Sequence, residues 1–417
     1  MDRLPEVPKT VGKTSLTPAM RLSWADVMAW RVRRHHLDRR APREAMLDVV
    51  AALCGLQAQL MSSAELALWA RVEGLEPEAV QRALWEERSL VKTWAMRGTL
   101  HLLPADELLL WQTVLSLDRR YLRPSWLRYF GVSPAELERL IAAVAQALDG
   151  RLLTREELAA EVSRLLGSAE LGGKLRHSWG TMLKPAAFRG HLCFCPSVGQ
   201  NVRFTRPDRW LGGVQQAETD TAEQVVTRRF LATYGPTTRE VFAQWLGTTA
   251  ARAGALIKAL DGEVTPVDLE GIPAWTLTSQ LGEIAGAKPP ESVRLLPAFD
   301  QYVIAASRHA SSMLPGPFKD RIYRPQGWIS PVLLVDGRMD GVWRHKRTGG
   351  RLEVHIEPFV ELSPRVRNEV EGEAERLAGF FGARLELVWA DQAVHASATS
   401  LQNRSGHDEL SPPAGRH

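Results

Sequence analysis

Hydrophobic and polar positions repeat one theme along this chain: amphipathic helical segments, then two short alternating segments around a turn. In the first instance, Ser-Trp-Ala-Asp at residues 23–26 predicts a capped helix, and Pro42 and Pro77 predict the starts of two more. Residues 90–96 and 99–105 are two candidate strands, joined by a turn at Arg97 and Gly98. The pattern therefore predicts a small helical unit closed by a hairpin.

The second instance has the clearest hairpin. Thr-Arg-Glu-Glu at residues 154–157 forms a capping box before an apolar helix. The basic and aromatic segment 174–190 predicts a groove-reading helix, and the alternating segment 191–210 predicts a hairpin. Helices followed by a basic hairpin are typical of winged-helix domains, in which the hairpin forms the wing.

A third instance covers residues 220–278, and its predicted recognition helix, Ala250–Leu260, carries only Arg252 and Lys258 as charges. We expect this copy to be structural. The predicted fold is α+β, with three tandem winged-helix units followed by a C-terminal β-rich region. The predicted divisions are a disordered leader (1–20), three winged-helix units (21–130, 131–216 and 217–290), a β-rich domain (291–391) and a disordered tail (392–417).

Composition fits a folded protein of several domains, with 417 residues, 45% of them hydrophobic and 24% charged. No apolar run reaches the roughly 18 residues that a membrane-spanning helix needs. The three cysteines, Cys54, Cys193 and Cys195, have neither a disulfide framework nor a metal-ligand spacing. We therefore expect a reduced cytoplasmic protein that does not enter the membrane and holds no metal.

Basic residues form two clusters. The first extends from Arg31 to Arg43 and includes Arg33 and Arg34, and the second contains Arg119, Arg120, Arg123 and Arg128. Solvated helix faces and direct phosphate contacts both produce such clusters, and the sequence leaves the two open. The net charge of +4 adds little, because it is small for a chain of this length.

The segment Gly-Leu-Gln-Ala-Gln-Leu at residues 55–60 alternates with a period of two. If Gly55 ends the preceding helix and the chain then runs extended, Leu56, Ala58 and Leu60 face the core. Gln57 and Gln59 then project together, and two primary amides can orient one water through donors and acceptors. A helix end with two solvated glutamines is the alternative, and the pattern by itself favours it.

Five segments in register resemble the tandem winged-helix DNA glycosylases of the AlkZ and YcaQ type, across about residues 20–390. They are GLQAQLMSSAELALWAR (55–71), LVKTWAMRGTLHLLPADE (90–107), GPTTREVFAQWLG (235–247), RLLPAFDQYVIAASRHA (294–310) and YRPQGWISPVLLVDGRMDGVW (323–343). The resemblance implies that a Gln-aliphatic-Gln element is catalytic, which maps onto Gln57, Ala58 and Gln59. Ala58 is a small occupant of the aliphatic position.

The chemistry of this family makes glutamines tolerable as catalytic groups. Removal of a nucleobase passes through an oxocarbenium-like transition state, as glycoside hydrolysis does. A purine alkylated at N7 is already cationic and leaves as a neutral base, so it needs no general acid. The resemblance therefore implies a monofunctional DNA glycosylase that acts without a cofactor on double-stranded DNA carrying alkylated purines. Under the same resemblance, the substrates can include bulky adducts and interstrand crosslinks.

The resemblance also places Arg97, Thr99 and His101 near the catalytic cleft, although a buried core histidine is the alternative for His101. Asp300 has two interpretations, a turn residue at a strand end or a cleft residue beside Tyr302. The predicted DNA-binding residues are Arg33, Arg34, Arg97, His101, Lys174, Arg176, His177, Trp179, Lys184, Arg189, Gln200, Asn201, Arg203, Arg308 and His309.

Two rival functions remain at this level. A non-enzymatic regulator built from winged helices usually needs a dimerisation element, and no sustained heptad run is present. We accordingly expect a monomer. A protein-interaction platform is the third possibility, and the absence of salt-dependent DNA binding would identify it.

Overall fold

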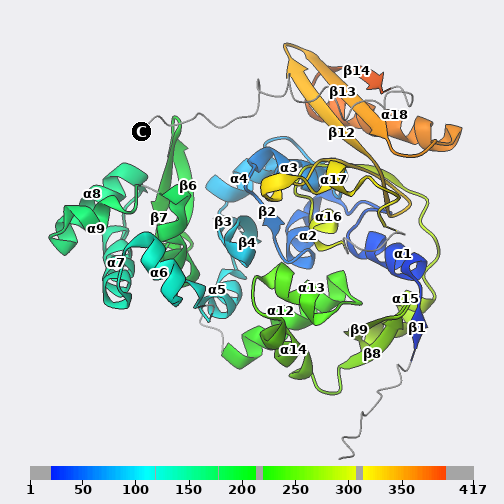
Figure 1. The fold of residues 1–417 in the computed structure, drawn as a ribbon. Coiled ribbons are helices and arrows are strands. Elements are labelled where there is room, and N and C mark those ends of the chain that lie inside the picture. The colour runs from blue at the N-terminus through cyan, green and yellow to red at the C-terminus, as the bar shows by residue number, and fades with distance from the viewer. Residues whose placement is uncertain (1–19, 118, 177, 213–218, 307–312, 391–417) are drawn as a thin grey trace, which may run out of the picture.

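The computed structural model describes residues 20–117, 119–176, 178–212, 219–306 and 313–390. Helices and strands are mixed along this part of the chain, and the strands form four sheets among the helices (Figure 1). The α+β class is confirmed. None of the helices in these residues is long and apolar enough to span a membrane.

The first group of elements carries the Gln57 segment. Its sheet has the order β2–β4–β3, and four helices accompany it. The bounds are α1 (Trp24–Arg34), α2 (Met46–Ala52), β2 (Leu56–Gln57), α3 (Met61–Trp69), α4 (Ala79–Trp85), β3 (Leu90–Trp94) and β4 (Leu100–Pro104). The predicted cap is present, because Ser23 and Asp26 form a reciprocal capping box at the start of α1.

The second group holds the predicted wing, in a sheet of order β5–β7–β6. Its bounds are α5 (Leu108–Ser116), η3 (Arg120–Leu122), α6 (Pro124–Phe130), α7 (Pro134–Ala147), β5 (Leu153–Thr154), α8 (Arg155–Leu166), α9 (Ala169–Gly173), η4 (Ser178–Leu183), α10 (Lys184–Phe188), β6 (Cys193–Val198), β7 (Asn201–Thr205) and α11 (Pro207–Trp210). The capping box of Thr154 and Glu157 and the hairpin are both present.

The single helix predicted over residues 174–190 is wrong. The segment contains the short turn η4 and then the five-residue helix α10. Gly180 has a φ of +77°, and a β-carbon there would lie 2.7 Å from the Trp94 ring. This close packing against β3 prevents a continuous helix, because regular helical backbone requires negative φ.

The third group pairs with the beginning of the chain. Strand β1 (Arg21–Leu22) runs parallel to β8, so residues 21–22 complete a sheet of order β1–β8–β9. The other bounds are α12 (Thr219–Tyr234), α13 (Arg239–Leu246), α14 (Ala250–Lys258), β8 (Val264–Leu269), β9 (Ile272–Leu277) and α15 (Leu281–Ala285). The predicted first and third units are therefore joined by a sheet that crosses between them.

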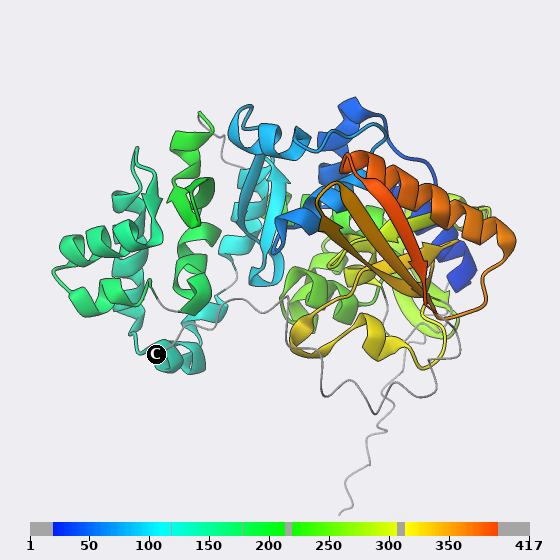
Figure 2. The same ribbon diagram turned by 90° about the horizontal axis from the view of Figure 1, so that it is seen from above.

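The C-terminal region is a five-stranded sheet of order β10–β11–β12–β13–β14. Its elements are β10 (Val293–Leu296), α16 (Gln301–Ala305), α17 (Lys319–Ile322), β11 (Val332–Val335), β12 (Arg338–Thr348), β13 (Arg351–Pro358), α18 (Pro364–Phe380) and β14 (Arg384–Trp389). Helix α18 connects β13 to its parallel neighbour β14 and lies along the sheet (Figure 2).

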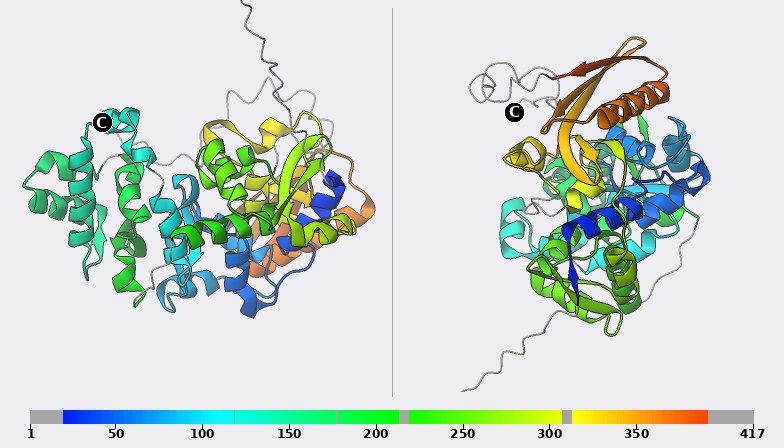
Figure 3. Two further views of the ribbon diagram at one scale, coloured as in Figure 1. Left: turned by 90° about the horizontal axis from the view of Figure 1, so that it is seen from below. Right: turned by 90° about the vertical axis from the view of Figure 1, so that its right-hand side faces the viewer.

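Two large hydrophobic cores cut across these groups. One combines Leu56 and Leu102 of the first group with Leu295 of the C-terminal sheet. The other combines Trp94 and helices α5, α7 and α8 with helices α12–α14, including Phe230. Figure 3 shows the consequence, with α6–α9 at one end of an elongated molecule and the other groups packed together. Side chains from distant parts of the sequence thus fix the surroundings of β2.

Candidate active site around Gln57

The predicted extended segment is present and begins at Gly55. This residue has a φ of +89°, and a β-carbon there would lie 2.6 Å from the Leu103 side chain. The chain then pairs with β4, where Gln57 lies opposite His101, and the Ala58 amide donates to the Leu100 carbonyl at 2.7 Å. A glycine is required because the turn enters the sheet in a backbone region that L-residues avoid.

The alternation of the segment is correct over its first half. Leu56 and Ala58 are fully buried, Gln57 is 8% exposed and Gln59 is exposed. The prediction that Leu60 faces the core is wrong, because its side chain is 38% exposed. The strand ends at Gln57, and Leu60 already serves as the N-cap of helix α3, so the period of two does not continue.

The Gln57 amide is held from one side by a guanidinium group. Arg97 Nη2 donates to Gln57 Oε1 at 3.2 Å, and Arg97 Nη1 donates to the Trp245 carbonyl at 2.7 Å. Within the described residues, no hydrogen-bond partner is present for the Gln57 amide nitrogen. Gln57 therefore presents a fixed amide with donor capacity left over.

Arg97 occupies a strained position in the turn between β3 and β4, in the short helix η2 (Met96–Gly98). Its φ is +60°, and its α-carbon lies 2.8 Å from the position that a β-carbon of Gly247 would take. Burial lowers the pKa of Arg97 to about 10, so the side chain stays charged at neutral pH. The third group thus fixes the turn through the C-terminal end of α13.

His101 is a fully buried neutral histidine. Its Nδ1 lies 3.0 Å from the Thr99 carbonyl, which can only accept, so Nδ1 carries the proton. Its Nε2 lies 3.4 Å from Arg97 Nη2, which can only donate. Burial and the charge of Arg97 lower the pKa of His101 to about 3. At physiological pH the ring accepts from Arg97 and has no proton to give to a leaving group from Nε2.

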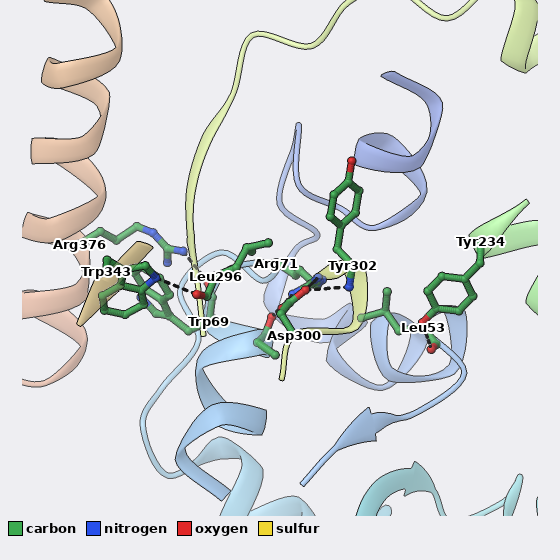
Figure 4. Close-up of polar contacts among 10 residues, drawn as sticks. Leu53, Trp69, Arg71, Tyr234, Leu296, Asp300, Tyr302, Trp343 and Arg376 are labelled. Atoms are coloured by element: carbon green, nitrogen blue, oxygen red, sulfur yellow. Dashed lines mark hydrogen bonds and ion pairs between the residues drawn. The ribbon is translucent and has the colours of Figure 1, made fainter. Parts of the chain in front are cut away.

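Helix α12 supports the residues that precede β2. Tyr234 donates its hydroxyl to the Leu53 carbonyl at 2.7 Å (Figure 4). Thr233 donates its hydroxyl to the Ala52 carbonyl at 2.6 Å. Arg31 of α1 is buried and donates to three consecutive carbonyls, those of residues 234–236. These contacts tie α1 and the end of α2 to the third group, just before the chain enters the candidate site.

Asp300 is a buried structural residue. Its two carboxylate oxygens each accept from Arg71 at 2.7 Å, and Oδ1 also caps α16 by accepting from the Tyr302 amide at 2.9 Å (Figure 4). Asp300 is 1% exposed, and the Tyr302 hydroxyl donates to the Gly337 carbonyl. These contacts agree with the interpretation of Asp300 as a turn residue, and Asp300 does not line an open cleft.

Comparison with known proteins identifies the family. The family model described as DNA glycosylase AlkZ-like matches residues 50–380. The chain belongs to the AlkZ-like DNA glycosylase family. It is 38% identical over 367 residues to the interstrand DNA cross-link repair glycosylase of Streptomyces sahachiroi, covering 86% of this chain and 96% of that protein. The solved structure of S. sahachiroi DNA glycosylase AlkZ matches with a TM-score of 0.79 and 37% identity, over 89% of this chain and all of that one. The resemblance noted in the sequence is confirmed.

As a member of this family the chain acts on DNA, and several of its predicted DNA-binding residues contact the protein itself. Arg33 and Arg34 donate to backbone carbonyls of residues 288 and 232. Lys174 donates to the Phe130 carbonyl, Arg176 pairs with Glu156 and Arg189 forms a bidentate pair with Glu138. These contacts hold the side chains against the protein.

The wing residues are more accessible. Gln200 and Asn201 are exposed at the tip of the β6–β7 hairpin, while Arg203 donates from Nε to the Pro196 carbonyl at 2.7 Å across it. His177, Arg308 and His309 lie outside the described residues, as does the side chain of Trp179. Thr99 contributes its carbonyl to His101, and its hydroxyl donates to the Met96 carbonyl.

Sequence reasoning missed the contributions of Tyr234, Trp245 and Gly247. All three lie in or beside the segment 235–247 that resembles the family, so the signal was present. The pattern could not show that this segment packs on the turn at Arg97, about 150 residues away along the chain.

Proposed function

We propose that this glycosylase hydrolyses the N-glycosidic bond of N7-alkylated, cationic purines in duplex DNA, and that Gln57 and Gln59 position the attacking water. The observation that carries the proposal is the amide of Gln57. It is nearly buried and anchored through its oxygen by Arg97, and its amide nitrogen is left for another partner. An amide fixed in this way acts by positioning, which is worth several powers of ten in rate.

The contacts of His101 and Asp300, the two acids considered for protonating the base, support a preference for cationic bases. His101 is neutral and its one proton is bound to the Thr99 carbonyl. The Asp300 carboxylate accepts hydrogen bonds from Arg71 and from the Tyr302 amide at the start of α16. Neither group can protonate a departing base, so the lesion must supply its own positive charge. Uncharged damaged bases are then poor substrates.

The finer architecture is also part of the proposal. Each of the three units predicted from the sequence, 21–130, 131–216 and 217–290, is a winged-helix unit, and the exposed wing at Gln200 and Asn201, with Arg203 at its base, contacts the DNA backbone. The enzyme acts as a monofunctional, cofactor-independent monomer. Its relative is named for interstrand crosslink repair, and we extend that activity to this chain. Crosslinked N7-alkylpurines share the cationic leaving group.

The first experiment is single-turnover excision of N7-methylguanine by Gln57→Ala and Gln59→Ala, with affinity for the duplex measured in parallel. We expect each variant to lose about 10²-fold in rate, the effect of removing one preorganised polar group, and to keep its affinity. Gln59→Asp is the matched control, because a carboxylate can replace the amide as an acceptor for water. Full excision rates in both alanine variants would contradict the assignment of Gln57 and Gln59 as the residues that position the water.

A second experiment compares leaving groups. N7-methylguanine and N3-methyladenine, both cationic, are excised, whereas hypoxanthine, 8-oxoguanine and uracil are not, in duplexes that each carry one lesion. Efficient release of a neutral base would require an acid that the proposal lacks. Sequence-specific binding without excision of any lesion would identify a regulator instead.

A further inference from the structure

A second polar site lies next to the candidate active site. Helix α5, turn η3 and the start of α6 face helices α12, α13 and α14 across a pocket of about 310 Å³. Its polar lining comes mainly from Arg119, Arg120, Arg123, Glu223, Thr248 and Arg252. The Gln57 amide does not line this pocket.

The pocket has an excess of positive charge. Among the described lining residues, four arginines accompany one carboxylate, and Glu223 is already paired with Arg252, through Oε2 at 2.6 Å. Among the described residues, no hydrogen bond or ion pair engages the side chains of Arg119 and Arg123. Like charges gathered at one pocket repel each other, and an anion bound there removes that cost. Arginine is suited to phosphate because its planar group presents several donors at once.

Gly247 connects the pocket to Arg97. A β-carbon at Gly247 would lie 2.8 Å from the Arg97 α-carbon and 3.1 Å from Arg120 Nη1, so the two arginines approach it together. Residues 246 and 248 line the pocket directly. On the other side of the turn, Lys184 Nζ lies 3.6 Å from the β-carbon position of Gly98. Cationic groups thus continue from the Gln57 anchor to the pocket.

We propose that this pocket binds a backbone phosphate of the DNA strand, at a fixed offset from the nucleotide that faces Gln57. The inference rests on the proposed function for the position of the lesion. A phosphate held there sets the register of the strand, because phosphate contacts fix position and orientation without reading sequence. The bound anion also offsets the charge of the arginines beside a site where positive charge develops on the sugar.

The test is Arg123→Gln, which removes one exposed charge without breaking a protein contact. Binding to an undamaged duplex should weaken about tenfold, the scale of one charge-assisted hydrogen bond. The slope of log affinity against log salt should fall by about 0.9, the value for one phosphate. Arg128→Gln is the matched control, because Arg128 is also exposed on α6 but does not line the pocket. Equal losses in both variants would mean diffuse surface attraction and would overturn the site.

Glu223→Gln gives a result of the opposite sign. Loss of the Glu223 carboxylate should tighten binding by about threefold and steepen the salt slope, because Arg252 becomes available to the phosphate. Unchanged or weaker binding by folded Glu223→Gln would count against the proposal.

Thermal unfolding with inorganic phosphate is a further test, which distinguishes a DNA phosphate from a free anion. The melting temperature of the wild type is compared in phosphate and in chloride of equal ionic strength. If phosphate stabilises the wild type, and Arg123→Gln abolishes this effect while the DNA salt slope is unchanged, the pocket is a site for free anions and the assignment to DNA is overturned.

Failure of this inference can be told apart from failure of the proposed function. Binding to undamaged duplex needs neither a lesion nor excision. If Arg123→Gln binds normally and Gln57→Ala is inactive, the pocket proposal fails alone. If Arg123→Gln loses one phosphate contact and Gln57→Ala excises normally, the catalytic assignment fails and the pocket remains.

Discussion

Replacement of Arg97 by methionine tests whether the guanidinium orients the Gln57 amide that we propose to be catalytic. Methionine keeps a long apolar stem and the same strain at positive φ, but it removes the donors to Gln57 Oε1 and the Trp245 carbonyl. A hydrogen bond from a charged group is worth about 1.5–3 kcal/mol. If the whole contribution acts in the transition state, single-turnover excision falls by about 10- to 100-fold.

The assay is excision of N7-methylguanine with enzyme in excess, below the unfolding transition, together with duplex affinity. Thr99→Val is the control, because it removes a hydroxyl bond to the Met96 carbonyl within the same turn and leaves the donors of Arg97 in place. We expect Thr99→Val to keep most of its activity. Arg97→Lys should recover only part of the rate, because lysine keeps the charge but its compact ammonium does not reproduce the planar fork that reaches both acceptors.

A double-mutant cycle separates orientation from general damage. In a Gln57→Ala background, Arg97→Met should cost little further rate, because the amide that it orients is gone. Fully additive losses would show that Arg97 acts independently of Gln57. An unchanged rate in Arg97→Met itself would refute the reasoning directly.

Three further predictions concern stability and the strand that carries Gln57. Gly74→Ala has open space around it, so in urea unfolding it should cost only the strain of its positive φ, roughly 1–2 kcal/mol, and should keep activity. Gly55→Ala has the same kind of strain and also places a β-carbon against the Leu103 side chain, so it should destabilise the fold by more than Gly74→Ala does and slow excision. Burial lowers the pKa values of His101 and His35 from 6.5, so both histidines stay neutral in the folded protein but bind protons when it unfolds. The free energy of unfolding should therefore fall on acidification, by about 1.4 kcal/mol for each histidine between about pH 7.5 and 5.5. His101→Gln should reduce that loss, because it removes one of the two groups. Asp300→Ala should cost about 3–5 kcal/mol, because it leaves a buried guanidinium without a partner, yet excision per folded molecule should survive at low temperature; selective loss of excision would restore Asp300 as a candidate acid.

Local sequence determined much of the secondary structure and the position of the candidate motif. The capping boxes at Ser23 and Thr154 and the β6–β7 hairpin follow from short-range chemistry, since their partners lie within a few residues. Gly55 predicted the break before β2, and Leu56 and Ala58 face the core as the alternation requires. The family followed from several segments in the same order rather than from one motif.

Tertiary structure decided the features that depend on distant partners. The segment 174–190 is helical by composition, but close packing of Gly180 on Trp94 breaks it. Leu60 fits an apolar position of the alternation, but the start of α3 leaves it exposed.

The candidate site shows the same division. The sequence predicted Gln57 as a candidate site residue. The orientation of its amide depends on Arg97, and the turn that carries Arg97 is fixed by the Trp245 carbonyl and by Gly247. The charge state of His101 is likewise a property of the folded protein, because burial and the neighbouring guanidinium lower its pKa. Periodicity reports which way a side chain faces, and only the packed chain brings together the groups that decide its hydrogen bonds and its charge.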